Sequence, residues 1–169
     1  MTLPHQQAKR TERGEAVILF TVGQTTFAIG AGSVEEIRSA SGLRPSVQSG
    51  ARLGATRFVL ERAGKTYSVV DAGLYFGGSP AHLPRLLVLR GRAVALMVEQ
   101  VGLMTRITAL YALPHAFTGE ERQWYRGLAL LPGSNGECQV VPVINPAAFL
   151  GQAEIPALRS PSRTKGAAV

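Results

Sequence analysis

The chain has 169 residues, 46% of them hydrophobic, and a formal net charge of +7 at pH 7. A chain of this length can bury one core, as a single domain or as two small subdomains. It has no stretch of the roughly 20 apolar residues that a membrane span needs, and its polar, basic N-terminus lacks the apolar segment of a secretory signal. The single cysteine, Cys138, excludes an intrachain disulfide and fits a reducing compartment.

The positive charge is concentrated near the two ends of the chain. Five of the seven net positive charges lie in residues 1–14 and 155–169, which are also rich in Pro, Ser, Thr, Gln, Ala and Gly. Segments of this composition cannot bury enough apolar surface to offset the entropy that ordering costs. We therefore predict disordered basic tails at residues 1–14 and 153–169, and a folded body at residues 15–152 that carries little net charge.

The first half of the body has the pattern of a β-hairpin, a connector, two more strands and a short helix. The expected segments are residues 16–22, 25–30, 33–38, 56–61, 67–71 and 72–76. In the connector, Val34 and Ile37 are three residues apart, which places them on one face of a short helix or on one flank of an irregular turn. Asp71 is placed to cap the helix, and Gly77 to end it.

The second half repeats this order. The corresponding segments are residues 86–89, 93–98, 98–101, 124–131, 140–144 and 146–150. Asn145 stands where Asp71 stood, as the cap of a helix whose first residue is Pro146. The connector Val98-Glu99-Gln100-Val101 echoes Val34-Glu35-Glu36-Ile37 at the same place after a hairpin. A diverged repeat of this kind predicts a mainly β protein of two small barrels rather than alternating βαβ units.

The residues that could carry chemistry do not gather into a catalytic pattern. His5, His82 and His115 have no second ligand at metal-binding spacing, and Cys138 has no nearby His or Cys. Asp71 is the only aspartate, and helix capping accounts for its position, so a general acid/base pair has no candidates. We expect no enzyme activity, no metal and no cofactor.

The order of these segments resembles the CheW-like domain, the coupling domain of bacterial chemotaxis arrays. The matching segments are residues 18–23, 27–29, 34–38, 69–71, 94–101, 125–128 and 140–150. The resemblance implies two intertwined five-stranded SH3-like β-barrels with short helices, roughly residues 33–80 and 85–145, with strand exchange. It also implies a non-catalytic cytoplasmic adaptor that couples the cytoplasmic tip of a methyl-accepting chemotaxis receptor to a CheA-type histidine kinase. Other CheW-like domains are further partners, with no nucleic acid bound and no membrane insertion.

In such proteins the receptor packs between the subdomains, near a Val-x-Glu-Ile connector and a turn usually written Asn-Leu-Arg-Gly. The resemblance therefore implies a receptor-binding groove at Val34, Glu36, Ile37, Arg62 and Gly64. The turn departs from the family pattern because Ala63 stands at the usual arginine position. Arg62 is one residue away, and a one-residue shift in a strand points a side chain to the other face unless the turn compensates.

A second class of protein fits the composition. A basic SH3-like or OB-like β-barrel that binds RNA or DNA requires cationic side chains that converge on one barrel face, and its binding would fall steeply with salt.

Overall fold

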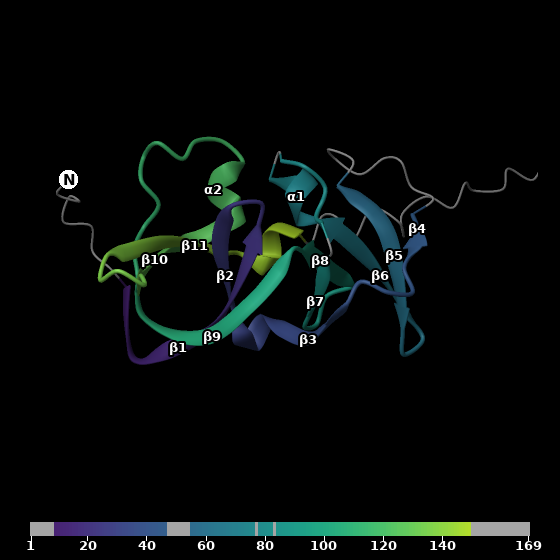
Figure 1. Cartoon of the computed structure of the whole chain (residues 1–169), viewed down its shortest axis with the longest axis horizontal. Coiled ribbons are helices and arrows are strands. Elements are labelled where there is room, and N and C mark those ends of the chain that lie inside the picture. Colours follow the sequence, from purple (N-terminus) through teal and green to yellow (C-terminus); the bar gives the residue numbers. More distant parts are fainter. Residues whose placement is uncertain (1–8, 47–54, 77, 83, 150–169) are drawn as a thin grey trace, which may run out of the picture.

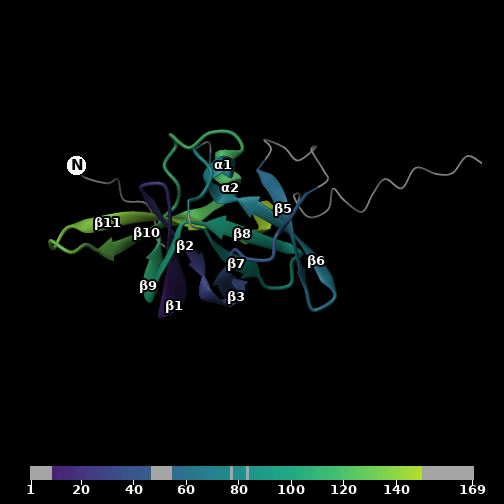
Figure 2. The same ribbon diagram turned by 45° about the vertical axis from the view of Figure 1, so that its right-hand side comes forward.

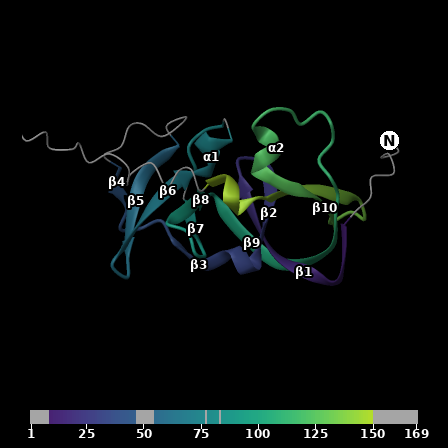
Figure 3. The same ribbon diagram turned by 180° about the vertical axis from the view of Figure 1, so that it is seen from behind.

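The computed structural model describes residues 9–46, 55–76, 78–82 and 84–149. The described chain is mainly β and forms two sheets that lie side by side along the long axis of the molecule (Figure 1). Seen from the opposite side, the β5–β6 hairpin still lies toward one end of this axis and β10 toward the other (Figure 3). The mainly β, two-sheet prediction is confirmed.

The first sheet has the strand order β10-β11-β2-β1-β9. Its strands are β1 (Lys9–Val22), β2 (Thr25–Gly30), β9 (Gln100–Leu110), β10 (Tyr125–Pro132) and β11 (Cys138–Ile144). A backbone bridge between Tyr111 and Leu128 joins the end of β9 to β10, so the two edges of this sheet meet. The β10–β11 hairpin extends away from the rest of the molecule (Figure 2).

The second sheet has the order β3-β7-β8-β6-β5-β4. Its strands are β3 (Val34–Ser39), β4 (Arg44–Pro45), β5 (Thr56–Arg62), β6 (Lys65–Asp71), β7 (Arg85–Leu89) and β8 (Val94–Val98). The sixth strand, β4, adds to the five that were predicted. It consists of two residues that pair with β5, Arg44 with Val59 and Pro45 with Phe58, and it falls between the expected segments 33–38 and 56–61, where the sequence predicted no strand.

The two halves of the chain exchange their hairpins. The β1–β2 hairpin of the first half lies in the sheet of β10 and β11, and the β7–β8 hairpin of the second half lies in the sheet of β5 and β6. A parallel strand pair joins each exchanged hairpin to its sheet. Strand β2 pairs with β11 at Ala28 and Val143, and β8 pairs with residues 68–71 of β6. Neither half can therefore form its sheet without the other.

Each half ends in the strand-to-helix step that the repeat predicted. The buried Asp71 carboxylate accepts hydrogen bonds from the backbone N–H groups of Gly73 and Leu74, at 3.0 and 3.4 Å, at the start of α1 (Ala72–Tyr75). At the second copy, Asn145 Oδ1 accepts from Ala147 N at 3.2 Å, beside the 3₁₀ helix η3 (Pro146–Phe149). Both polar side chains satisfy N–H groups that a helix start leaves free.

One hydrophobic core joins the two sheets. Phe20 and Ile29 of the first sheet belong to the same buried cluster as Leu87 and Leu96 of the second. The helices close this cluster, since the rings of Tyr75 from α1 and Phe149 from η3 lie 4.8 Å apart between centroids. Because the two sheets bury their apolar faces together, the described chain forms one folding unit.

The structure corrects two local predictions and adds two short helices. Residues 9–14 are part of β1 rather than of a tail, because Lys9 and Arg10 pair through their backbones with Leu110 and Ala109 of β9, and ladder hydrogen bonds do not require apolar side chains. The connector is the strand β3 rather than a short helix or an irregular turn. Two short helices, η1 (Ala31–Ser33) and α2 (Glu121–Trp124), were not predicted. The tail predictions for residues 1–8 and 153–169 lie outside the described residues.

Candidate partner-binding groove

A groove of about 670 Å³ lies where the two connectors of the repeat meet. It is lined by Ile37 of β3, by Glu99, Gln100 and Val101 at the start of β9, and by His82 and Arg85. Figures 1 and 3 show β3 and β9 close together at the same edge of the molecule. Ile37 and Val101 end the two equivalent four-residue connectors, so the groove lies on the internal repeat and takes one apolar side chain from each half.

The two apolar residues of β3 have different environments. Val34 is 6% exposed and packs in the shared core, whereas Ile37 is 39% exposed. A β-bulge separates them, because Val34 pairs with Leu89 while Glu36 pairs with the next residue, Val88. Residues three apart in a regular strand point to opposite faces, and the bulge disturbs this alternation, so the exposed fractions rather than the spacing assign the two roles. Val34 is therefore a core residue, and Ile37 is free to contact a partner.

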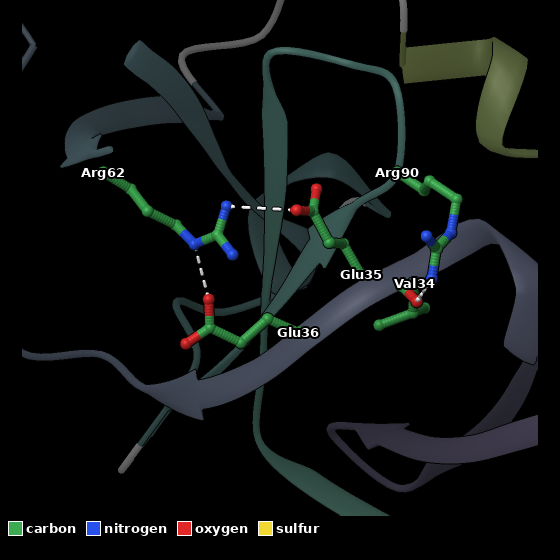
Figure 4. Close-up of polar contacts among 5 residues, drawn as sticks. All are labelled: Val34, Glu35, Glu36, Arg62 and Arg90. Carbon is green, nitrogen blue, oxygen red and sulfur yellow. Dashed lines mark hydrogen bonds and ion pairs between the residues drawn. The ribbon is translucent and has the colours of Figure 1, made fainter. Parts of the chain in front are cut away.

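Arg62 joins the tip of the β5–β6 hairpin to the glutamates of β3 (Figure 4). Its Nε donates to Glu36 Oε2 at 2.5 Å, and its Nη1 donates to Glu35 Oε1 at 3.3 Å. The hydrogen bond to Glu36, and after it one to Tyr67, raise the pKa of Arg62. This contact ties β5 to β3 across the face of the second sheet.

A tight turn places Arg62 where it reaches these glutamates. Arg62 pairs with Lys65, and the two residues between them, Ala63 and Gly64, have φ of +49° and +74°. Two consecutive positive φ values define the type I′ hairpin turn, which usually has Asn or Gly at the first position. Ala63 is the one non-glycine residue with positive φ in the described part of the chain. The displaced arginine thus does reach the connector, despite the one-residue shift.

The predicted site residues therefore have four different environments. Glu36 and Arg62 are in direct contact. Val34 lies in the core beneath them, and Ile37 lines the groove. Gly64 is at the tip of the hairpin, where an added Cβ would meet no atom within 4 Å, so it contributes only its backbone conformation.

Sequence reasoning missed three residues that contribute to this region. Arg90, from the turn after β7, donates from Nε to the carbonyl oxygen of Gly32 at 3.1 Å and from Nη2 to that of Val34 at 3.5 Å (Figure 4), so it holds the start of β3. Val101 and Glu99 line the groove opposite Ile37. The repeat contained the signal for Val101, since it is the counterpart of Ile37, but an arginine that bonds to backbone oxygens leaves no pattern in a sequence.

Asp71 also holds a wall of the groove. Besides capping α1, its carboxylate accepts a hydrogen bond from Ala81 N, at 3.3 Å to Oδ1. Ala81 directly precedes His82, which lines the groove. The bonds to three backbone N–H groups satisfy a carboxylate that is fully buried, which supports a structural rather than a chemical role for Asp71.

Several arginines are neutralised by glutamates elsewhere on the surface. Arg126 forms a two-pronged pair with Glu15, at 2.6 and 2.9 Å, and Arg44 contacts Glu61 at 2.7 Å. The hydrogen bond from Arg126 lowers the pKa of Glu15. A nucleic-acid-binding barrel requires unpaired cationic side chains on its surface. Pairing with glutamates lowers the number of such side chains on the folded body.

Within residues 9–46, 55–76, 78–82 and 84–149, no group of three or more His, Cys, Asp or Glu side chains is placed to hold a metal ion. No helix among these residues is long and apolar enough to cross a membrane.

Comparison with known proteins agrees with this geometry. The model of the CheW-like domain family matches residues 16–154. The chain belongs to the CheW-like domain family. Its fold is similar to that of the scaffolding protein TtCheW from Thermoanaerobacter tengcongensis, with a TM-score of 0.65 and 14% sequence identity over 89% of this chain and 92% of that one. None of the curated proteins matches the sequence. The family match covers both connectors and both strand-to-helix steps.

Proposed function

We propose that this CheW-like protein is a non-catalytic cytoplasmic adaptor that couples chemoreceptors to a CheA-type histidine kinase. In this proposal the groove at Ile37 and Val101 takes the helical hairpin at the cytoplasmic tip of a methyl-accepting receptor. The kinase binds through the second half of the chain, outside the groove. Other CheW-like domains are further partners in an assembled array.

The observation that carries the proposal is the exposed Ile37 in a groove built from both halves of the repeat. An amphipathic helix binds by placing apolar side chains in such a groove, while charges at the rim set orientation and association rate. Here Ile37 and Val101 offer the apolar contact, and Arg85 and Glu99 supply charges of both signs. A mixed rim of this kind fits a protein helix better than a polyanion.

The ion pair of Arg62 with Glu36 holds β3, the strand that carries Ile37, in position. It fixes β3 directly beside Ile37, so the apolar side chain is presented from a strand that is tied on one side to β7 and on the other to the β5–β6 hairpin. A binding surface that is held in place before its partner arrives loses less conformational entropy on binding.

The test replaces Ile37 by aspartate and measures the affinity for a receptor hairpin. Val140→Asp is the matched control, because Val140 is an apolar residue of β11 with 52% exposure that does not line the groove. We expect Ile37→Asp to weaken hairpin binding by well over tenfold, about 1.4 kcal/mol per factor of ten, and Val140→Asp to leave it unchanged. A folded Ile37→Asp variant with normal affinity would remove the groove from the binding site.

A further inference from the structure

A second hollow lies between the tip of the β5–β6 hairpin and the turn from β7 to β8. Its volume is about 370 Å³. Among the residues that line it are Arg62 and Lys65 from the hairpin, Arg92 from the turn, Glu35 from β3 and Tyr67 from β6. Three of these side chains are cationic and one is anionic, so the wall carries an excess of two positive charges.

Two of the three cations form no ion pair with any residue that the structure describes. Glu35 and Glu36 pair with Arg62. Among the residues that the structure describes, the side chains of Lys65 and Arg92 form no ion pair. Arg92 is half-buried, and a guanidinium that is partly removed from water is stabilised by an anion that it can hydrogen-bond. The hollow is therefore short of negative charge.

The shape of the hollow is fixed by short, well-defined elements. One side is the two-residue type I′ turn at Ala63 and Gly64, and the other is the turn at Gly91, which has φ of +66°. The buried Tyr67 belongs to the wall. Arg62 is oriented by hydrogen bonds to its two glutamates and to Tyr67, and these bonds use three of its five N–H donors. Donors thus remain on Arg62, Lys65 and Arg92 for one shared ligand.

We propose that this hollow is a carboxylate-binding pocket that takes an Asp or Glu side chain of a partner protein. The inference rests on the proposed adaptor function in one respect, that the ligand belongs to a partner protein. The ligand is a carboxylate because the partner is a protein, in which Asp and Glu supply the anionic side chains, and an arginine binds a carboxylate through two parallel N–H···O hydrogen bonds.

The pocket and the groove share one strand. Glu35 lines the pocket and Ile37 lines the groove, and two residues span about 6.6 Å along a strand. A partner that contacts Ile37 is therefore within one side chain's length of the pocket. The apolar groove would supply most of the contact area, while the pocket would select partners that carry an acidic residue at the matching position.

The test titrates the full chain with a short capped peptide that contains glutamate and with the same peptide containing glutamine. Binding is followed through the NMR signal of the Arg92 Nε–H group. We expect saturable shifts with the glutamate peptide only. Arg92→Gln and Lys65→Gln, followed by backbone amide signals near the pocket, should each weaken binding about tenfold, in line with loss of a charged hydrogen bond. Glu35→Gln should tighten it several-fold, because it removes the resident negative charge.

Arg57→Gln is the control for overall charge. Arg57 lies on β5, with its guanidinium 5.4 Å from the centroid of the Phe58 ring, and it does not line the pocket. Equal responses to both peptides, or equal weakening by Arg57→Gln and Arg92→Gln, would overturn the proposal, as would saturable binding of inorganic phosphate without any response to glutamate. Ile37→Asp should still bind the glutamate peptide. Peptide binding therefore tests the pocket, and binding of the receptor hairpin tests the adaptor function separately.

Discussion

Alanine substitution of Val34 and Ile37 separates the core role of one from the binding role of the other. Val34 is 6% exposed in the core that both sheets share. Valine to alanine removes two methyl-sized groups, each worth about 0.8 kcal/mol of burial, and the cavity adds to this, so we expect the free energy of unfolding to fall by about 2–3 kcal/mol. Ile37 is 39% exposed, and its truncation removes three carbon groups that are only partly buried, so it should cost about 1.5 kcal/mol.

Urea unfolding at an unchanged m-value measures the two losses, and titration with a receptor hairpin measures binding by the folded protein. Val34→Ala should be clearly destabilised yet bind the hairpin with nearly normal affinity. Ile37→Ala should lose less stability than Val34→Ala and should bind the hairpin more weakly. The reasoning is refuted if both variants lose the same stability, or if Val34→Ala loses affinity while it remains folded.

Three further predictions follow from single contacts. Ala63→Gly should raise the free energy of unfolding by about 0.5–1 kcal/mol, because the left-handed conformation at φ +49° costs alanine about 1–2 kcal/mol; a lower melting temperature would contradict the type I′ turn. Glu36→Lys should slow association with a receptor hairpin, since it sets two cations against each other, and adding Arg62→Glu should restore much of the rate. The ion pair with Arg126 lowers the pKa of Glu15 in the folded state. The pair therefore stabilises the fold at pH values above the ordinary pKa of 4.5, and this stabilisation is lost as the pH falls through the lowered pKa. The free energy of unfolding of Glu15→Gln, measured against pH, should be lower than that of the parent near neutral pH and should converge with it at low pH.

The parts of the fold that depend on local chemistry could be predicted from the sequence. Asp71 and Asn145 each follow an apolar strand and precede a short helix, and both do bond the first free N–H groups of those helices. The repeat of hairpin, connector, strand, strand and helix was also visible. A capping residue acts within two or three positions of itself, so the sequence contains the whole interaction.

The parts that depend on distant pairing could not be predicted in the same way. The three-residue spacing of Val34 and Ile37 suggested one face of a short helix or one flank of an irregular turn, but the segment is a strand with a bulge at Glu35. The bulge exists only in relation to β7, about fifty residues further along the chain. The contact of Arg62 with Glu36 likewise joins residues 26 positions apart, and it depends on a turn type that Ala63 alone would not suggest.

The extension of β1 has a similar cause. Residues 9–14 are polar and basic, and composition alone indicated a tail. Their strand arises from backbone pairing with the end of β9 after an irregularity between Arg10 and Glu15, where Gly14 takes a φ of +69°. Backbone hydrogen bonds of this kind depend on the position of the neighbouring strand rather than on the side chains of the segment itself.

The central claim is that this CheW-like protein links two partners, and a three-component binding experiment tests it most directly. A CheA-type kinase is passed over an immobilised receptor hairpin with and without the protein. The account predicts that the kinase is retained only when the protein is present, and that Ile37→Asp abolishes retention while the variant still binds the kinase in solution. A folded protein that binds neither the hairpin nor the kinase, or kinase retention that Ile37→Asp leaves unchanged, would contradict it.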